Sequence, residues 1–139
     1  MTKPSNAEFQ SLLAMPPEDY MNSWQTQFFQ RLLQHERQAL IESIAELKSQ
    51  LQHSEQQGDE ADKAIREEEL RLLFRQIDRE SRLLPKFDAA LKRLAQGEYG
   101  YCLQTGEPIG LPRLLLRPTA ELSIDAKMKQ EKVEAQYRK

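Results

Sequence analysis

The chain has 139 residues, of which 30% are charged and 7% are aromatic, and its formal net charge is −2. This length suits one domain, and the composition fits long exposed helices better than a compact sandwich or barrel. A domain that coats DNA usually carries a basic excess, which this chain lacks. Acidic side chains nevertheless concentrate at residues 55–69 and basic ones at residues 113–139, so we expect a partner that recognises local charged patches.

A short helix and a proline turn are predicted at the start of the chain. Residues 5–8 read Ser-Asn-Ala-Glu, the form of a capping box, and apolar residues follow at helical spacing. Met15 and the two prolines after it should end this helix, because the residue before a proline is forced out of the helical conformation. We expect residues 1–22 to form an N-terminal segment that packs on a small globular head formed by later residues.

Two long amphipathic helices should form an antiparallel hairpin over residues 23–96. Apolar residues recur mostly in steps of three, four or seven along residues 24–51 and again along residues 65–94, which gives each helix one apolar stripe. A polar break with a glycine separates the stripes, so residues 56–64 should form the tip of the hairpin. Each arm needs the other, because isolated helices with so little apolar surface are marginal. An ordinary bundle is a weaker interpretation, since no third helix of comparable length is available.

A small head and a last helix are expected after the hairpin. Pro85 lies inside the second arm, where it removes one hydrogen bond and should bend the helix near residues 81–85. Glycines and prolines are frequent after the second arm, so residues 97–122 should form tight turns around one or two short strands. Residues 123–139 should form a C-terminal helix. Four side chains are expected to pack the head: Tyr101, Ile109, Leu114 and Ile124.

The head carries the spacing of a zinc finger without its ligands. Residues 102–105 and 123–126 are two four-residue units with seventeen residues between them, as expected of two Cys-x-x-Cys pairs around tetrahedral zinc. Only Cys102 supplies a thiolate, and the other three degenerate positions are Thr105, Ser123 and Ala126. We therefore predict no metal and interpret Cys102 as a structural residue. The predicted fold class is mainly α: a long antiparallel coiled-coil hairpin, a small degenerate zinc-finger-like head and a C-terminal helix.

Further runs of residues surround these four positions: Gly100-Tyr101-Cys102, Gly106, Ile109-Gly110, Arg113-Leu114 and residues 117–126. Together they closely resemble the head of the DksA/TraR family. Zinc-binding members have cysteine at all four positions, and this chain keeps one, so it resembles the zinc-independent DksA paralogue of pseudomonads. Residues 59–64 also reproduce the Asp-x-x-Asp-x-Ala tip motif of DksA proteins. The resemblance weakens only near the N-terminus.

The resemblance implies a transcription regulator that binds RNA polymerase, as core enzyme or holoenzyme. In the family the hairpin enters the secondary channel and places its tip near the active site, without sequence-specific DNA binding, to modulate initiation at ribosomal promoters. By position, the tip residues are Asp59, Asp62 and Ala64. The two aspartates would also suit the N-terminus of the second helix, where acidic side chains are favourable.

The resemblance also implies a binding site for the alarmone ppGpp, between the polymerase and the base of the hairpin. Its basic positions correspond to Lys86, Arg117 and Lys127, with Leu83, Arg79 and Arg113 nearby. ppGpp would be a co-regulator, and no stably bound cofactor and no zinc are expected. Guanidinium groups suit bidentate phosphate binding, and a lysine adds a point charge.

Two other functions stay open from the sequence. A Gre-like elongation factor would use the acidic tip to hold a metal ion and stimulate transcript cleavage, and a coiled-coil adaptor or chaperone would have no link to polymerase. An enzyme is not expected, because the chain shows no nucleophile–base pair, phosphate-binding loop or metal cluster. The chain lacks a signal-peptide pattern and a long apolar run, so we expect a cytoplasmic monomer without membrane contact.

Overall fold

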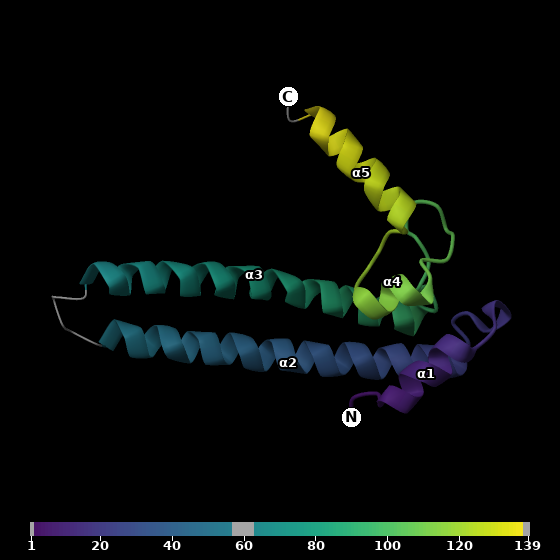
Figure 1. The fold of residues 1–139 in the computed structure, drawn as a ribbon, viewed down its shortest axis with the longest axis horizontal. Coiled ribbons are helices and arrows are strands. Elements are labelled where there is room, and N and C mark those ends of the chain that lie inside the picture. The colour runs from purple at the N-terminus through teal and green to yellow at the C-terminus, as the bar shows by residue number, and fades with distance from the viewer. Residues whose placement is uncertain (1, 57–62, 138–139) are drawn as a thin grey trace.

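The structure, a computed structural model, describes residues 2–56 and 63–137 and consists mainly of helices (Figure 1). Two long helices, α2 (Ser23–Gln56) and α3 (Lys63–Gln96), lie side by side and antiparallel. The remaining described elements are α1 (Asn6–Ala14), the 3₁₀-helix η1 (Pro17–Asp19), α4 (Leu111–Leu116) and α5 (Ile124–Tyr137). The predicted mainly α fold, with a long hairpin, a small head and a C-terminal helix, is therefore confirmed.

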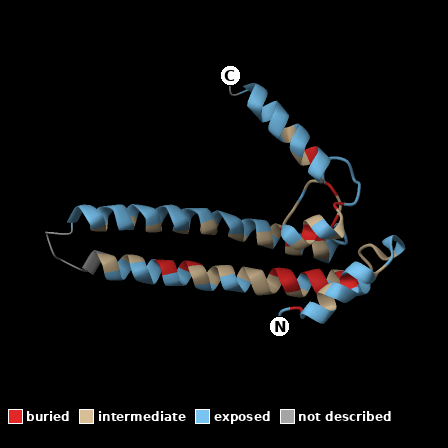
Figure 2. Cartoon of the chain, in the orientation of Figure 1, coloured by how far each residue is buried: buried red, intermediate tan, exposed pale blue. Residues whose placement is uncertain are grey.

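The two arms of the hairpin are equal in length and are joined by apolar and polar contacts. Each arm has 34 residues, which at 1.5 Å per residue gives a rod of about 51 Å. Ile44 and Leu47 are buried on the stripe of α2. Across the arms, the Ser43 hydroxyl donates to the Glu80 carboxylate at 3.0 Å, and Arg37 Nε pairs with Asp88 Oδ1 at 2.7 Å. Figure 2 shows that buried residues gather mainly at the head end of the hairpin.

Pro85 does not interrupt the second arm. Helix α3 is continuous through this residue, although proline cannot donate the backbone hydrogen bond of its position. The next apolar residues of the stripe, Phe87 and Leu91, pack against the core, and this packing helps to hold the helix together after the proline. The bend predicted at residues 81–85 stays a prediction.

The core sits at the base of the hairpin, where α1, both arms and the head meet. Its largest fully buried side chains include Phe28 and Phe29 of α2 and Tyr99 of the head. Phe29 contacts Tyr99 at a ring-centroid distance of 5.4 Å, and Phe28 contacts Phe9 of α1 edge-on at 5.0 Å. Such aromatic pairs stabilise the fold beyond the contribution that comes from burying their apolar surface. The main core therefore lies at the base, from which the arms extend.

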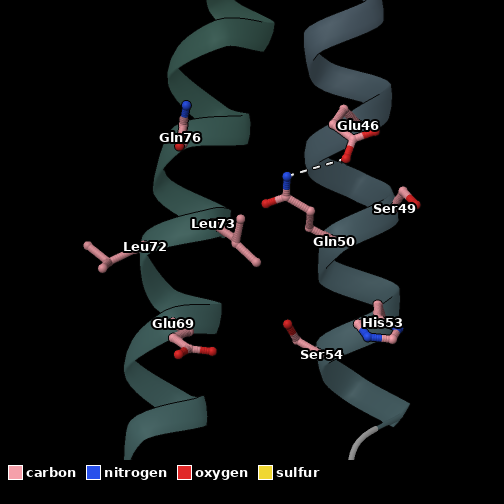
Figure 3. A pocket seen from close by; sticks show the side chains of 9 residues that line it. All are labelled: Glu46, Ser49, Gln50, His53, Ser54, Glu69, Leu72, Leu73 and Gln76. Carbon is pink, nitrogen blue, oxygen red and sulfur yellow. Dashed lines mark hydrogen bonds between the residues drawn. The ribbon is translucent and has the colours of Figure 1, made fainter.

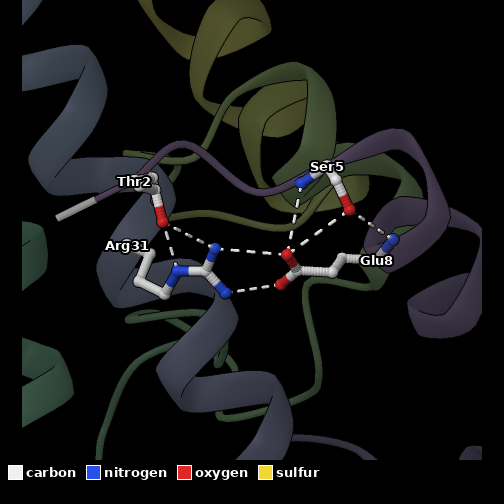
Figure 4. Close-up of polar contacts among 4 residues, drawn as sticks. All are labelled: Thr2, Ser5, Glu8 and Arg31. Atoms are coloured by element: carbon white, nitrogen blue, oxygen red, sulfur yellow. Dashed lines mark hydrogen bonds and ion pairs between the residues drawn. The ribbon is translucent and has the colours of Figure 1, made fainter.

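Polar contacts attach the N-terminal segment to the arm and to the head. The predicted capping box of α1 is present, with Ser5 and Glu8 each bonding the backbone of the other. Figure 4 shows Arg31 of α2 reaching the Glu8 carboxylate and the Thr2 carbonyl. The hydrogen bond from Arg31 is the main cause of the lowered pKa of Glu8. On the other side, the Tyr20 hydroxyl donates to the Gly100 carbonyl of the head.

The head differs in three details from the sequence-based expectation. Its predicted strands are reduced, in the described residues, to one isolated antiparallel bridge between Tyr101 and Pro108. Helix α4 was not predicted, because Pro112 was read as a turn signal, yet a proline in the first turn of a helix loses no hydrogen bond. Ile109 and Leu114 are buried as predicted, but Ile124 is 54% exposed. It begins α5, which projects away from the head (Figure 1).

In the described parts of the chain, no helix has the length and apolar character that a membrane span requires.

Candidate functional site

The predicted tip lies mostly outside the described residues. Asp59 and Asp62 fall within residues 57–62, for which no structure is described. Ala64 is the second residue of α3 and is exposed. The ends of α2 and α3 that flank the tip lie at the far end of the hairpin from the head (Figure 1).

At the opposite end, a cavity of about 460 Å³ lies between α3, α4 and the start of α5. We call it the base cavity. Four predicted ppGpp-site residues line it, and each comes from a different place in the fold. Lys86 lies on α3, Arg113 on α4, Arg117 directly after α4, and Lys127 in the first turn of α5. Leu83 and Arg79 also lie on α3, but they do not line the cavity.

The charge of the base cavity favours an anion. Four lining residues are cations and one, Glu121, is an acid. In the described part of the chain, none of the four cations forms an ion pair. Like charges held close together repel one another, and an anion bound among them relieves that repulsion. The cavity can therefore hold a polyanion such as a phosphate ester.

Local hydrogen bonds involve two of these cations to different extents. Arg113 Nε donates to the Leu122 carbonyl at 2.9 Å, so part of its guanidinium is used inside the head. The Lys127 ammonium has only a long contact of 3.5 Å with the Gln130 amide oxygen. The backbone amide of Lys127 donates to the Ser123 carbonyl at 2.9 Å, which starts α5 at this point. Part of the Arg113 guanidinium therefore stabilises the head, whereas the Lys127 ammonium remains available to a bound anion.

Sequence reasoning missed the polar residues that complete the lining. They are Gln104, Thr119, Glu121 and Gln130. It also missed Arg93, a buried residue of α3 whose Nη1 pairs with Glu121 Oε1 at 3.3 Å. A signal for Arg93 did exist in the sequence, since it lies between Leu91 and Leu94 near the apolar stripe of the second arm. Nothing in the sequence indicated Glu121 as its partner.

The four degenerate zinc positions lie close together in the head. Hydrogen bonds from the Thr105 side chain and the Ser123 backbone reach the Cys102 thiol. The Ser123 hydroxyl in turn accepts the backbone amide of Ala126 at 3.2 Å. One thiol, two hydroxyls and a methyl group are not a donor set for structural zinc, which needs four strong ligands. Within the described residues, no group of three or more potential metal ligands is present either.

Cys102 is only 3% exposed, in agreement with a structural residue. Burial raises the pKa of its thiol, but hydrogen bonds from Thr105, Ser123 and Gln104 outweigh burial and lower the pKa to about 6. These donors come from both four-residue units. The head therefore surrounds the Cys102 sulfur with hydrogen-bond donors from both units, although cysteine is absent from the other three positions.

A second hollow, of about 580 Å³, lies between the arms in their distal half. Figure 3 shows Leu73 directed toward α2, and Gln50 donating to Glu46 Oε1 within α2 at 3.4 Å. Most of its other lining residues are polar, whereas the interface of a coiled coil is normally apolar. None of the predicted site residues lines this hollow. It indicates that the distal arms are held together less by apolar burial than the base is.

A long helical hairpin on a small finger-like head, with a cationic cavity at the base, defines a recognisable class of protein. The family described as DnaK suppressor protein DksA, N-terminal domain, matches residues 25–94. The family described as prokaryotic dksA/traR C4-type zinc finger matches residues 97–132. The chain belongs to the DksA/TraR family, as the resemblance predicted.

Individual relatives agree with this assignment. A protein named RNA polymerase-binding transcription factor DksA, from Caulobacter vibrioides, is 40% identical over 88% of this chain and 89% of its own length. The protein of that name from Escherichia coli is 38% identical over 81% of this chain and 75% of its own length. The solved structure of transcription factor DksA2 from Pseudomonas aeruginosa is 51% identical, with a TM-score of 0.85, and the match covers 91% of this chain and 98% of that one. These relatives are transcription factors and not enzymes.

Proposed function

We propose that the protein binds RNA polymerase in the cytoplasm and regulates transcription initiation, for instance at ribosomal promoters, together with ppGpp and without zinc. The observation that carries this proposal is the base cavity at the foot of a long rod, where four cations line one hollow and form no ion pair with any described residue. The names of the relatives support RNA polymerase as the partner. The protein would act as a monomer and would not read DNA sequence.

In this proposal the hairpin enters the secondary channel of the polymerase with its acidic tip first. A rod of about 51 Å, from two helices of 34 residues each, can deliver carboxylates at a fixed distance from a docked head. Asp59 and Asp62 would compete for basic groups or disturb mobile catalytic elements near the active site. They would thereby shift the equilibrium of the open promoter complex. Ala64 would allow the tip to approach closely.

The base cavity would bind the phosphates of ppGpp at the surface shared with polymerase. Arg117 can form paired hydrogen bonds with phosphate oxygens, while Lys86 and Lys127 add point charges. Arg113 would contribute charge while its Nε holds the Leu122 carbonyl. Leu83 and Arg79 would make only peripheral contacts, because they do not line the cavity.

Zinc independence is supported by the way the head is held together. The Tyr99 hydroxyl donates to the Pro118 carbonyl at 2.7 Å, and the Cys102 amide donates to the Glu107 carbonyl at 2.8 Å. Leu114 is fully buried in the same core cluster as Tyr99 and Cys102. Treatment with a zinc chelator should therefore leave the helical circular-dichroism signal and the activity unchanged. A loss of helix on chelation would refute zinc independence.

The decisive experiment is in vitro transcription from a ribosomal promoter with purified polymerase, with and without ppGpp. The wild-type protein should inhibit the promoter more strongly when ppGpp is present. Asp59→Asn and Ala64→Thr should abolish the effect while polymerase binding, measured separately, stays close to the wild-type level. Glu18→Gln in η1 is a control that removes one exposed carboxylate, which belongs neither to the tip nor to the lining of the base cavity. Normal regulation by the two tip variants would contradict the tip assignment.

The wild-type protein and its tip variants also test the two competing functions. Stimulation of RNA cleavage in paused complexes, lost in Asp59→Asn, would assign the protein to Gre-like factors instead. Failure to bind polymerase at all would favour a coiled-coil adaptor.

A further inference from the structure

We infer that the ion pair between Arg93 and Glu121 positions the cations of the base cavity, an inference that rests on the proposed ppGpp site. Arg93 lies in the last turn of α3 and is 9% exposed, and its Nη1 pairs with Glu121 Oε1 at 3.3 Å. Its Nη2 is buried without a hydrogen-bond partner among the described residues. A buried charge with a single partner depends strongly on that partner. Arg93 therefore holds the Glu121 side chain against the end of α3.

Glu121 is at the same time part of the segment that builds one wall of the base cavity. Its backbone carbonyl accepts the Leu103 amide at 2.9 Å, and the next carbonyl, of Leu122, accepts Arg113 Nε at 2.9 Å. The backbone of this segment is thus attached to the head, while the Glu121 side chain attaches it to the hairpin. In the described chain, the pair with Arg93 is the one ion pair that joins α3 to this segment.

This connection determines how the cations of the cavity lie relative to one another. Lys86 is carried by α3, the helix that also carries Arg93. Arg117 precedes the segment that contains Glu121, and Lys127 follows it at the start of α5. Without the pair, the side-chain link between Glu121 and α3 is lost, so the wall with Arg117 and Lys127 can shift relative to Lys86 within the limits set by the hydrogen bond between Tyr99 and Pro118. Arg93 and Glu121 are therefore positioning residues, and neither needs to touch the phosphates.

The inference can be separated from a simpler electrostatic role of Glu121. If this carboxylate only opposed a bound anion, its removal would strengthen phosphate binding, because one negative charge would leave the cavity. If it positions the cavity wall, its removal weakens binding although the repulsion is relieved. Glu121→Gln therefore gives effects of opposite sign under the two explanations.

The test is the concentration of ppGpp that gives half of the maximal effect on a ribosomal promoter, with polymerase and the full-length protein. Glu121→Gln should raise this concentration roughly threefold or more, as expected for the loss of a coupled contact. Arg93→Met should do the same, and the double variant should be no worse than Arg93→Met alone. Arg93→Lys, which keeps the charge, should restore most of the response. Glu107→Gln removes an exposed carboxylate elsewhere in the head and should leave the value unchanged.

A second measurement needs neither ppGpp nor polymerase. The Leu103 amide should exchange its hydrogen faster in Glu121→Gln and Arg93→Met than in the wild type and Glu107→Gln, because the Glu121 carbonyl that it bonds becomes mobile. Unchanged exchange in Glu121→Gln, or a lower half-maximal ppGpp concentration, would overturn the inference. A wild-type protein that binds polymerase but ignores ppGpp would instead overturn the proposed ppGpp role. The exchange measurement would still decide whether the pair positions the segment.

Discussion

The hydroxyl of Tyr20 joins the N-terminal segment to the head, and its removal should destabilise the base of the hairpin. This hydroxyl donates to the Gly100 carbonyl and accepts the Gly110 amide at 3.0 Å. Burial raises the pKa of Tyr20, so the hydroxyl stays protonated and able to donate at neutral pH. Tyr20→Phe removes both hydrogen bonds and keeps the ring, which contacts Tyr101 edge-on at 5.6 Å.

The two backbone groups are affected unequally by this change. The Gly100 carbonyl keeps a second donor, the Ile109 amide at 2.8 Å, whereas the Gly110 amide loses the one partner that it has in the described structure. A lost hydrogen bond costs about 1 kcal/mol, and leaving a partly buried donor unpaired adds about 1 to 2 kcal/mol more. We therefore expect the free energy of unfolding to fall by about 2 to 3 kcal/mol, which lowers the melting temperature by roughly 5 to 10 °C.

Urea unfolding followed by the fluorescence of Trp24 provides the assay. Trp24 stacks on Phe28 at a ring-centroid distance of 5.8 Å, so its emission reports on the base of the hairpin. Tyr137→Phe is the matched control, because Tyr137 is 86% exposed and its change should stay within about 0.5 kcal/mol. If Tyr20→Phe unfolds at the same urea concentration as the control, the hydroxyl does not hold the segment to the head.

Two further predictions concern the head. The lowered pKa of Cys102, about 6 in place of the ordinary 9, means that between these pH values the unfolded chain binds a proton that the folded chain has released. The free energy of unfolding should therefore rise from pH 6 to pH 9. In Cys102→Ser this rise should be smaller, as measured by urea unfolding at several pH values. An equal rise in the variant and the wild type would contradict the lowered pKa. Gly100→Ala and Gly106→Ala both place alanine at a positive φ, of 93° and 76°, but an added Cβ meets the Met21 side chain at 3.0 Å only at Gly100. Gly100→Ala should thus lower the melting temperature more than Gly106→Ala, and equal melting temperatures would show that Met21 moves aside at little cost.

The hairpin and the outline of the head could be predicted from local sequence patterns. The apolar stripe of each arm has a helical period, and the absence of glycine and proline in residues 23–56 leaves no reason for that arm to end early. The capping box at Ser5 is likewise a contact between residues three apart, which a sequence displays directly. The degenerate zinc positions were recognisable from spacing and from the resemblance to a known family. Features of this kind depend on neighbours along the chain.

The residues that line the base cavity could be predicted only in part from the sequence. The resemblance named Lys86, Arg117 and Lys127 as the basic positions, and all three line the cavity. Of the residues that it placed nearby, Arg113 also lines the cavity, whereas Arg79 and Leu83 do not. The prediction for Ile124 was wrong for a related reason: an apolar residue near the head was assumed to pack into it, although α5 leaves the head at this point. Composition and spacing do not show in which direction a helix departs.

The ion pair between Arg93 and Glu121 was decided by the tertiary structure alone. The position of Arg93 near an apolar stripe is a signal for its burial, but the sequence does not reveal which segment will cover it or supply its partner. Here the head folds back on the end of α3, buries the Arg93 guanidinium and supplies the Glu121 carboxylate. Burial and pairing depend on which segments come together in space, and the strength of a charge interaction depends on both. The periodic pattern therefore determined the rod, and the packing of the head determined the cavity at its base.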